Sequence, residues 1–453
     1  MNGLSGTIRK PDLLLCEEGV IAKRVSEQGK FDMRTDVYSV GEVKKKYNEE
    51  HKKDSYVELA GKVAFVLEAQ DGRCAVPGIQ ILGTTIILTF FDRGGSVSTY
   101  PLDIHQHPEQ FLRILLGVTF ADGISLGFDP TISPAQNSHK RIRIIKQGKE
   151  YHILVDTLLF FSGSLHSRGT TVWSGKVTID EEEQDVVIKD SWVDPLRRYT
   201  EGRILKILEM AGVKGVPILV HEQQVQTEHP VTREFINHST HILRTLLGPS
   251  PQPSYYLRVL SRLVSRPRGY PIFDFNSLPE LLVGLIDCLS GVSDPLLPDL
   301  ENLHLVAHHD ALKRAHILHR DISLFNLLLV LAMHSNLGED FLDRVLQGPE
   351  KTRVQAKIQK LSRRGHLGDW GYAVPTDDAC SKDFTQGATT GATGVRISGE
   401  TQPVSRVNLK DTHNIIIPVA DEPLPSGAGS LIDASPLQRT VCFPLYIYPL
   451  QSF

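Results

Sequence analysis

The chain has 453 residues, which as a length corresponds to about three ordinary domains. Its 49 basic and 53 acidic side chains give a formal net charge of −4, so it lacks the basic surplus typical of general nucleic-acid-binding proteins. Apolar residues make up 41% and charged residues 23%, as in globular proteins, which argues against a wholly disordered chain.

No stretch of the sequence has the apolar length of a membrane span. The longest nearly apolar run, Ile79 to Phe91, contains glycine, glutamine and threonine and is shorter than the roughly 20 residues that cross a bilayer. The first residues lack a charged stretch followed by an apolar core, so we expect no signal peptide. We therefore expect neither a membrane nor a nucleic acid as a partner.

The five cysteines stand far apart and are odd in number. No two have the spacing of a zinc site, and the pattern does not suit a disulfide framework. A reducing compartment fits best, so we expect an intracellular protein, with the cytoplasm and the nucleus equally open.

The first 140 residues combine a charged segment with predicted helices and strands. Residues 1–55 are charged and mixed, and Lys44–Lys46 with Glu49–Asp54 predict the solvated face of an exposed helix. Apolar residues recur every three or four positions from Tyr56 to Gln70, which predicts an amphipathic helix. Ile79–Leu82 and Thr84–Phe91 are rich in β-branched residues and bounded by glycines, so they predict strands. A further helix is expected over Pro108–Leu116.

Residues 141–192 change to a pattern of short antiparallel strands. Arg141–Ile145 and Tyr151–Val155 flank a turn at Gln147–Lys149, which predicts a hairpin. Further strands are expected at Leu158–Phe161, Thr170–Ile179 and Val186–Lys189.

The later part of the chain predicts helices and then loops. Glu201–Met210 has the spacing of a helix, and from about 231 to 332 the pattern predicts mostly helix, including Leu278–Leu289. Residues 376–436 lack periodicity and predict loop or disorder. A β-rich half followed by a helical half predicts an α+β fold of two lobes with a cleft between them.

The strongest chemical signal is His319-Arg320-Asp321, followed five residues after the aspartate by Asn326. Apolar runs enter and leave this segment, a pattern typical of the catalytic loop of a phosphotransferase. Asp321 would orient the acceptor hydroxyl and accept its proton, and Asn326 would offer a neutral oxygen to the metal of the nucleotide. Arg320 is expected to position the loop or meet an anion of the activation segment, and His319 to pack inside. The alternative is a chance occurrence in a helical linker.

Asp369-Trp370-Gly371 has the Asp-x-Gly form of a magnesium-binding aspartate. The glycine allows the backbone to turn sharply, so that the carboxylate and a phosphate-bound metal can meet. Taken alone, the tripeptide is equally compatible with an ordinary turn. Its position after the Asp321 segment favours the metal-binding interpretation.

Lys189 closes a β-branched run and matches the strand lysine that clamps the α- and β-phosphates of ATP. A predicted helix follows, and its Glu201 or Glu209 is a candidate partner that would keep Lys189 charged and aimed. The alternative is a surface lysine at a strand end.

The segment Ser162–Trp173 lies between two predicted strands. It lacks the G-x-G-x-x-G spacing, yet Gly169 and its neighbours could offer backbone N–H groups to phosphates. A plain hairpin turn is the competing interpretation.

With these elements in order, the chain resembles the fungal-type protein kinase domain family over about residues 35–375. The resemblance is carried by the motifs above together with Phe91–Gly95, His107–Arg113, Leu126–Ile132, Arg168–Trp173, Val187–Trp192, Glu201–Leu205 and Ile317–Asn326. It favours Glu201 over Glu209 as the partner of Lys189. It also implies ATP and Mg²⁺ as cofactors, with the nucleotide near Lys189, Glu201, Gly169, Asn326 and Asp369 and the metal on Asn326 and Asp369.

The resemblance implies a bilobal protein-kinase-like fold. We expect a charged segment at 1–55, a family-specific extension at 56–140, a β-rich N-lobe at 141–230, a helical C-lobe at 231–375 and an irregular tail resembling an activation segment at 376–453. Insertions are expected near 290–306, where an unspliced segment is one explanation, and near 331–365, with a helix over Leu342–Leu361. Later helices of the large lobe are missing, so we expect a truncated C-lobe.

Three functions fit these features. The first is an ATP- and Mg²⁺-dependent protein Ser/Thr kinase whose protein substrate is unknown. The second is a pseudokinase or nucleotide-binding scaffold, because the supporting lobe is short. The third is a small-molecule kinase, because Ser323 stands where many protein kinases place a lysine.

Overall fold

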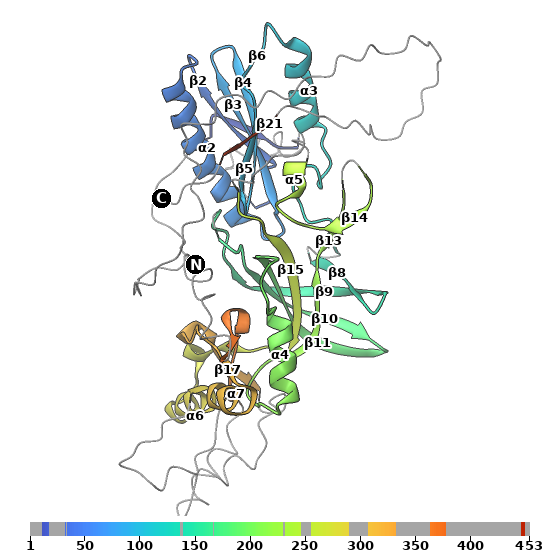
Figure 1. Cartoon of the computed structure of the whole chain (residues 1–453), viewed down its shortest axis with the longest axis vertical. Helices are drawn as coiled ribbons and strands as arrows, with labels where there is room; N and C mark the ends of the chain where they lie inside the picture. Colours follow the sequence, from blue (N-terminus) through green and yellow to red (C-terminus); the bar gives the residue numbers. More distant parts are fainter. Residues whose placement is uncertain are drawn as a thin grey trace, which may run out of the picture.

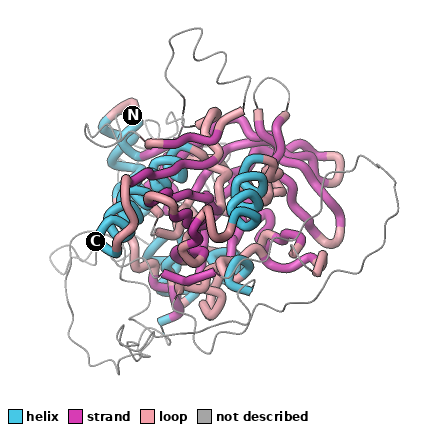
Figure 2. The backbone as a smooth tube through the Cα atoms, turned by 90° about the horizontal axis from the view of Figure 1, so that it is seen from above, coloured by secondary structure: helices cyan, strands magenta, loops and turns pink. Residues whose placement is uncertain are grey.

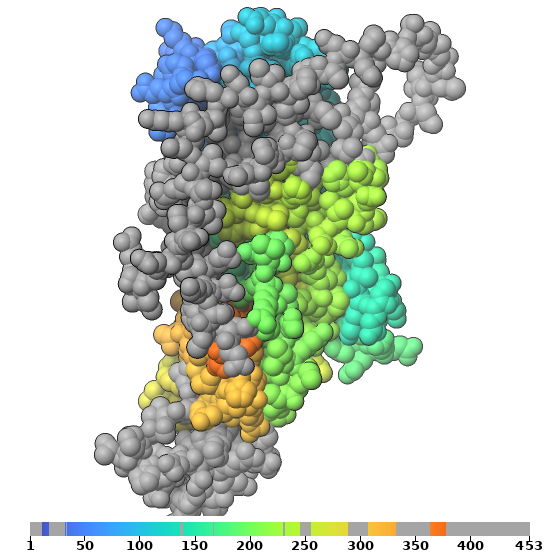
Figure 3. All heavy atoms as spheres, in the orientation of Figure 1, coloured from blue at the N-terminus to red at the C-terminus, as the bar shows by residue number. Residues whose placement is uncertain are grey.

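The computed structural model of the chain describes residues 11–17, 32, 34–135, 139–165, 167–229, 232–245, 255–289, 307–331, 363–376 and 445–448. Two β-sheets and a smaller region of helices and short strands follow each other along the long axis (Figure 1). The same order is visible on the surface as blue, green and orange regions (Figure 3). Seen from above, strands run through the middle and helices lie beside them (Figure 2). The fold is thus a mixed α+β fold, as predicted.

The first sheet and its two helices are here called the extension. Its strands have the order β1-β2-β3-β4-β5-β21, with β6 paired to β4, and β2 and β3 are parallel. The strands are β1 (Leu13–Leu15), β2 (Ser39–Lys44), β3 (Ala75–Leu82), β4 (Thr85–Asp92), β5 (Gly95–Thr99), β6 (Leu102–Asp103) and β21 (Leu445–Tyr448). The predicted strands at Ile79–Leu82 and Thr84–Phe91 are confirmed as parts of β3 and β4.

Helices α2 (Glu49–Ala69) and α3 (Pro108–Thr119) cover opposite faces of the first sheet. Leu59 and Val63 of α2 pack in one core with Phe91 of β4, whereas Ile114 of α3 packs in another with Ile86. This division follows from the strand period of two, which sends neighbouring side chains to opposite faces. Both helices were predicted. Helix α2 begins seven residues earlier than expected, at the Asn48 cap, so part of the charged segment forms its exposed face.

The second sheet is antiparallel throughout, with the order β12-β15-β11-β10-β9-β8-β7. Its strands are β7 (Ile132–Pro134), β8 (Lys140–Lys146), β9 (Lys149–Phe161), β10 (Thr171–Ile179), β11 (Glu182–Val193), β12 (Ile218–Gln224) and β15 (Val259–Arg266). The predicted hairpin at 141–155 is confirmed. The separate strand expected at Leu158–Phe161 is instead the end of β9, which bulges against β10 and so continues past the irregularity.

Helix α4 (Glu201–Met210) begins and ends where the sequence predicts, with the Thr200 side chain accepting a hydrogen bond from the Arg203 backbone N–H. Its buried residues Ile204, Leu205 and Leu208 share a core with the last region of the fold. That core joins the second sheet to the part of the chain that carries the Asp321 and Asp369 motifs.

The prediction of mostly helix from about 231 to 332 is wrong. Helix α6 (Leu278–Leu289) is confirmed, and α5 (Ile242–Thr245) and α7 (Ala307–Ala315) are also helical, but much of the remainder forms strands. In β15, Val259, Leu260, Leu263 and Val264 are all buried, because this strand has neighbours on both sides and is covered on both faces. Apolar pairs four residues apart imitate the spacing of an amphipathic helix.

The other strands of this part of the chain are short. They are β13 (Gln226–Glu228), β14 (Phe235–Asn237), β16 (Tyr270–Pro271), β17 (Ile317–Leu318), β18 (Leu327–Leu331), β19 (Arg363–Leu367) and β20 (Val374–Pro375). The predicted insertion at 290–306, the predicted helix Leu342–Leu361 and nearly all of the predicted loop region 376–436 lie outside the described residues. Among the described helices, none combines the length and apolarity needed to cross a bilayer.

A buried charge network ties the second sheet to the segment that leads into it. The Arg262 guanidinium on β15 donates to Asp190 on β11 at 2.7 and 2.8 Å and to Asp129, which precedes β7, at 2.9 Å. It also donates to the Thr131 hydroxyl at 2.7 Å. Burial alone would lower the pKa of Arg262, but the two carboxylates outweigh this and raise it. The cation is therefore permanent and links β11 and β15 to the segment before β7.

Removing this cation should strongly destabilise the fold. We expect Arg262→Met to lower the free energy of unfolding by about 3–5 kcal/mol, because Asp190 and Asp129 would stay buried without a partner. The control is Arg113→Met, which removes one member of an exposed ion pair on α3 and should change little. Urea denaturation of both variants checks the prediction, and equal losses would contradict it.

A buried histidine makes the stability depend on pH. Burial and the nearby Arg364 charge lower the pKa of His366 on β19 from 6.5 to about 4. The ring is neutral when folded, so its contribution is complete above the unfolded pKa and is lost as the pH falls from 6.5 towards 4. Between about pH 7 and about pH 5 we expect the wild type to lose about 2 kcal/mol more than His366→Gln.

The measurement is urea denaturation at both pH values. His152→Gln, at an exposed position of β9, is the control and should keep the wild-type dependence. The same pH dependence in His366→Gln as in the wild type would contradict the assignment.

Candidate functional site

Lys189 brings three separate segments together. It lies on β11, is 9% exposed, and its Nζ donates to Glu201 Oε2 at 2.7 Å and to Asp369 Oδ1 at 2.5 Å. Glu201 is the first residue of α4, and Asp369 directly precedes the 3₁₀ helix η6 (Trp370–Tyr372). Glu209, the other candidate partner, is exposed near the end of α4. The ammonium group thus bridges a strand, a helix and a turn.

The charges in this cluster support one another. Burial alone would lower the pKa of Lys189, but Asp369 and Glu201 outweigh it and raise the pKa, so the ammonium stays protonated. For Asp369, burial acts to raise the pKa, yet Lys189 and then Arg168 hold it well below its usual range. Burial raises the pKa of Glu201, and the Asp369 charge adds to this while Lys189 opposes it. Asp369 is therefore the firmly ionised carboxylate of the pair.

The turn at Asp369 depends on its glycine. Asp369 has a left-handed backbone, with φ of 52°, and its side chain accepts a hydrogen bond from the Gly371 N–H at 3.3 Å. A Cβ on Gly371 would lie 2.9 Å from Asp369 Oδ1 and 3.1 Å from Arg168 Nη1. Any side chain at 371 would therefore intrude between the charged groups.

The His319 ring connects the Asp321 segment to the Asp369 segment. His319 Nε2 bonds to the Gly368 carbonyl oxygen at 2.9 Å, and Nδ1 accepts from the Asp321 N–H at 3.3 Å, which requires a neutral ring protonated at Nε2. The ring also packs edge-on against Trp370, with centroids 4.5 Å apart. His319 is fully buried, as the sequence led us to expect.

Asn326 closes the loop that starts at Asp321. The Asn326 side-chain Nδ2 donates to the Asp321 backbone carbonyl oxygen at 2.8 Å. The Asn326 backbone carbonyl oxygen accepts from the Gly368 N–H at 2.8 Å. Arg320, directly before Asp321, has a left-handed backbone, with φ of 70°. The two motifs that are far apart in sequence are therefore neighbours through His319, Asn326 and Gly368.

The donor set suits a hard cation. Asp369 offers an ionised carboxylate, and Asn326 has its Nδ2 engaged, which leaves Oδ1 as the amide atom for a ligand. Mg²⁺ is usually held by one or two protein oxygens together with phosphates and waters, so two protein donors fit it. In the part of the chain that the structure describes, His, Cys, Asp and Glu side chains form no group of three or more that could hold a metal ion by themselves.

The loop between β9 and β10, residues 162–170, lies next to Lys189. Gly169 has φ of 53°, and its N–H donates to the Ser167 hydroxyl at 3.0 Å. The Arg168 guanidinium stacks on the Tyr372 ring at 4.1 Å and adds a positive charge to the cluster. Sequence analysis considered this loop for its backbone only, and the side chain of Arg168 was missed because its contacts with the Asp369 segment are distant in sequence.

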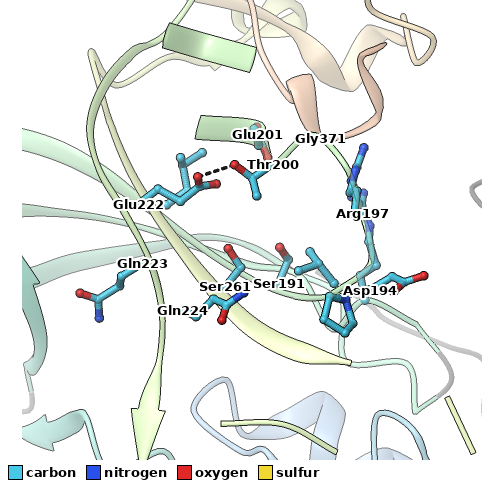
Figure 4. A pocket seen from close by; sticks show the side chains of 14 residues that line it. Ser191, Asp194, Arg197, Thr200, Glu201, Glu222, Gln223, Gln224, Ser261 and Gly371 are labelled. Carbon is cyan, nitrogen blue, oxygen red and sulfur yellow. Dashed lines mark hydrogen bonds between the residues drawn. The ribbon is translucent and has the colours of Figure 1, made fainter. Parts of the chain in front are cut away.

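A cavity of about 140 Å³ lies at the first turn of α4 (Figure 4). Ser191 and Ser261 lie side by side on one wall, and Arg197 and Asp194 stand on another. Glu222 on β12 accepts from the Thr200 hydroxyl at 2.6 Å and from the Gly202 N–H at 2.9 Å, which places a carboxylate on the helix N-terminus. The cavity was not predicted, because its walls come from β11, β12, β15, α4, η6 and the loops between them.

The comparison with protein families gives one match. The family model described as fungal protein kinase matches residues 10–395, which is most of the chain. The comparison with curated proteins gives no match. The chain belongs to the fungal protein kinase family.

Proposed function

We propose that this protein is an ATP- and Mg²⁺-dependent kinase that transfers the γ-phosphoryl group to serine or threonine hydroxyls of a protein substrate. The observation that carries the proposal is the single ion cluster in which Lys189 contacts both Glu201 and Asp369. Burying a lysine and two carboxylates carries a desolvation penalty, so such a cluster contributes little to stability. Its position in the fold therefore favours a functional role.

Each residue has a distinct proposed role. Lys189, aimed by Glu201, would bind the phosphate oxygens of the nucleotide, and the loop with Gly169 would cover them. Asp369 and Asn326 would hold Mg²⁺, which when bound supplies positive charge to the phosphate oxygens. Asp321 would orient the acceptor hydroxyl and take its proton.

The two remaining predicted residues act through their neighbours. Arg320 would keep the Asp321 loop in its left-handed turn, and His319 would hold that loop against Gly368. We also propose the division predicted from the sequence, with an extension at 56–140, an N-lobe at 141–230 and a C-lobe at 231–375. In the structure, residues 1–55 contribute β1, β2 and the start of α2 to the first sheet and its helices.

A second candidate function is a small-molecule kinase. The observation that favours it is Ser323, a short hydroxyl side chain in the loop between Asp321 and Asn326 where many protein kinases carry a lysine. Transfer to metabolites in the absence of transfer to peptides would favour this function. Nucleotide binding without any transfer would instead favour a pseudokinase.

Replacement of Asp321 tests the proposed chemistry. We expect Asp321→Asn to lower kcat by about 10²–10⁴, because the acceptor hydroxyl loses its base, and to leave the KM for ATP nearly unchanged. The measurement is transfer of radiolabelled phosphate from ATP to a mixture of serine and threonine peptides. Asp310→Asn, in a helical ion pair on α7, is the control and should keep wild-type rates. Equal rates in Asp321→Asn and the wild type would refute the role of Asp321.

Glu201 and Glu209 form a matched pair on one helix. Glu201→Gln removes the charge that aims Lys189, so we expect affinity for MgATP to fall by about tenfold, whereas Glu209→Gln, at an exposed position, should bind as the wild type. Calorimetric titration with MgATP measures both. A loss of affinity in both variants, or in neither, would contradict the proposed aiming of Lys189.

A further inference from the structure

The β9–β10 loop (residues 162–170) rests on the extension. At its ends, the Ser162 N–H donates a hydrogen bond to the Thr170 carbonyl oxygen at 2.8 Å. The Trp192 N–H on β11 donates to the Arg168 carbonyl oxygen at 2.7 Å. Besides the contact of Arg168 with the Asp369 segment, the loop makes close contacts with residues of the extension, which lie about 70 to 100 positions earlier in the chain.

Leu165 of the loop is buried in the core of the extension. It is 9% exposed and belongs to the same cluster as Leu59, Val63 and Leu67 of α2 and Phe91 of β4. A buried leucine contributes on the order of 2 kcal/mol relative to an exposed one. The tip of the loop is therefore held by the hydrophobic effect in a core that belongs to another sheet.

The loop also fits closely against helix α2. A Cβ on Gly163 would lie 2.2 Å from the Glu68 Cα, a distance that no side chain could accept without movement of the backbone. Gly163 is thus required for the close approach of the loop to the helix.

Arg93 holds the loop from the side of the β4–β5 turn. Its side chain is 2% exposed, and Nη1 donates to the carbonyl oxygens of Gly163 at 2.8 Å and Ser164 at 2.5 Å. Its guanidinium lies against Gly169, where a Cβ would be 2.7 Å from Arg93 Nε. One side chain of the extension therefore contacts both ends of the loop.

The turn that carries Arg93 is itself fixed. Asp92 accepts the Gly94 N–H at 2.8 Å and forms a buried ion pair with Arg244. The Gly94 carbonyl accepts from the Tyr256 N–H at 3.0 Å, and Gly94 has no room for a side chain. Arg93 thus projects from a turn that is pinned on both sides.

We propose that the extension is the support that fixes the β9–β10 loop, with Leu165 and Arg93 as positioning residues. These two residues fix the position of Arg168 and Gly169 relative to Lys189. The contribution to nucleotide binding rests on the proposed function, whereas the anchoring of the loop does not. Loss of either contact would release the loop beside the proposed nucleotide site.

The test compares substitutions that differ in their contact with the loop. Leu165→Ala removes the buried anchor, and Leu126→Ala truncates a leucine of equal type in the other core of the extension, where it is 6% exposed. Arg93→Lys keeps the charge but loses the planar fork of donors. If Leu165→Ala does not fold, Arg93→Lys provides the same test of the anchoring by itself.

Hydrogen exchange of the full-length chain measures the anchoring directly. We expect amides of residues 162–170 to exchange about tenfold faster in Leu165→Ala and about threefold faster in Arg93→Lys, with no change in Leu126→Ala. MgATP affinity should fall by about tenfold in Leu165→Ala and stay at the wild-type value in Leu126→Ala.

The outcomes are distinguishable. Unchanged loop exchange in both Leu165→Ala and Arg93→Lys would overturn the anchoring. Faster exchange with undiminished MgATP affinity would overturn the positioning role. If the wild type binds no MgATP, the proposed function fails, and the exchange rates alone still decide whether the extension anchors the loop.

Discussion

A lysine ammonium group buried between two carboxylates sets the arrangement of the site. Lys189 reaches Glu201 on one side and Asp369 on the other, and these three residues belong to a strand, a helix and a turn. A buried charge is tolerated only when it is paired, so the sheet, helix α4 and the Asp369 turn must hold their relative positions. The His319 contacts then align the Asp321 loop with the same turn. The ion cluster and the His319 contacts thus bring the Lys189, Glu201, Asp321 and Asp369 segments together.

Local patterns in the sequence predicted the elements that have a single buried face. Helix α4 has one apolar stripe and one clear N-cap, and its bounds were predicted correctly. Strand β15 has two covered faces, so its apolar residues carry no alternation, and the prediction of helix there was wrong. The difference is physical, because periodicity reports a boundary between core and solvent and is absent where that boundary is absent.

The contacts of the site likewise fall into those that local sequence patterns predict and those that they do not. Strand and helix spacing left both Glu201 and Glu209 as partners of Lys189, and the family resemblance favoured Glu201. The His319 segment is a motif with its own chemistry. The direct contact of Lys189 with Asp369 and the stacking of Arg168 on Tyr372 join distant segments, and nothing in a local pattern specifies them. For Leu165 the sequence offers an apolar residue inside a polar loop, a signal that is visible only in retrospect. Gly163 and Gly169 were visible as turn residues, but the side chains that require them were not.

The path of the β9–β10 loop has a consequence for how the gene can change. Surface loops ordinarily accept insertions and deletions, because their residues make few buried contacts outside the two strands that they connect. This loop begins and ends in one sheet and places Leu165 in the core of the other. Adding or deleting one residue would withdraw that side chain or break the hairpin. Its length should therefore be held constant during divergence, while its exposed residues drift freely.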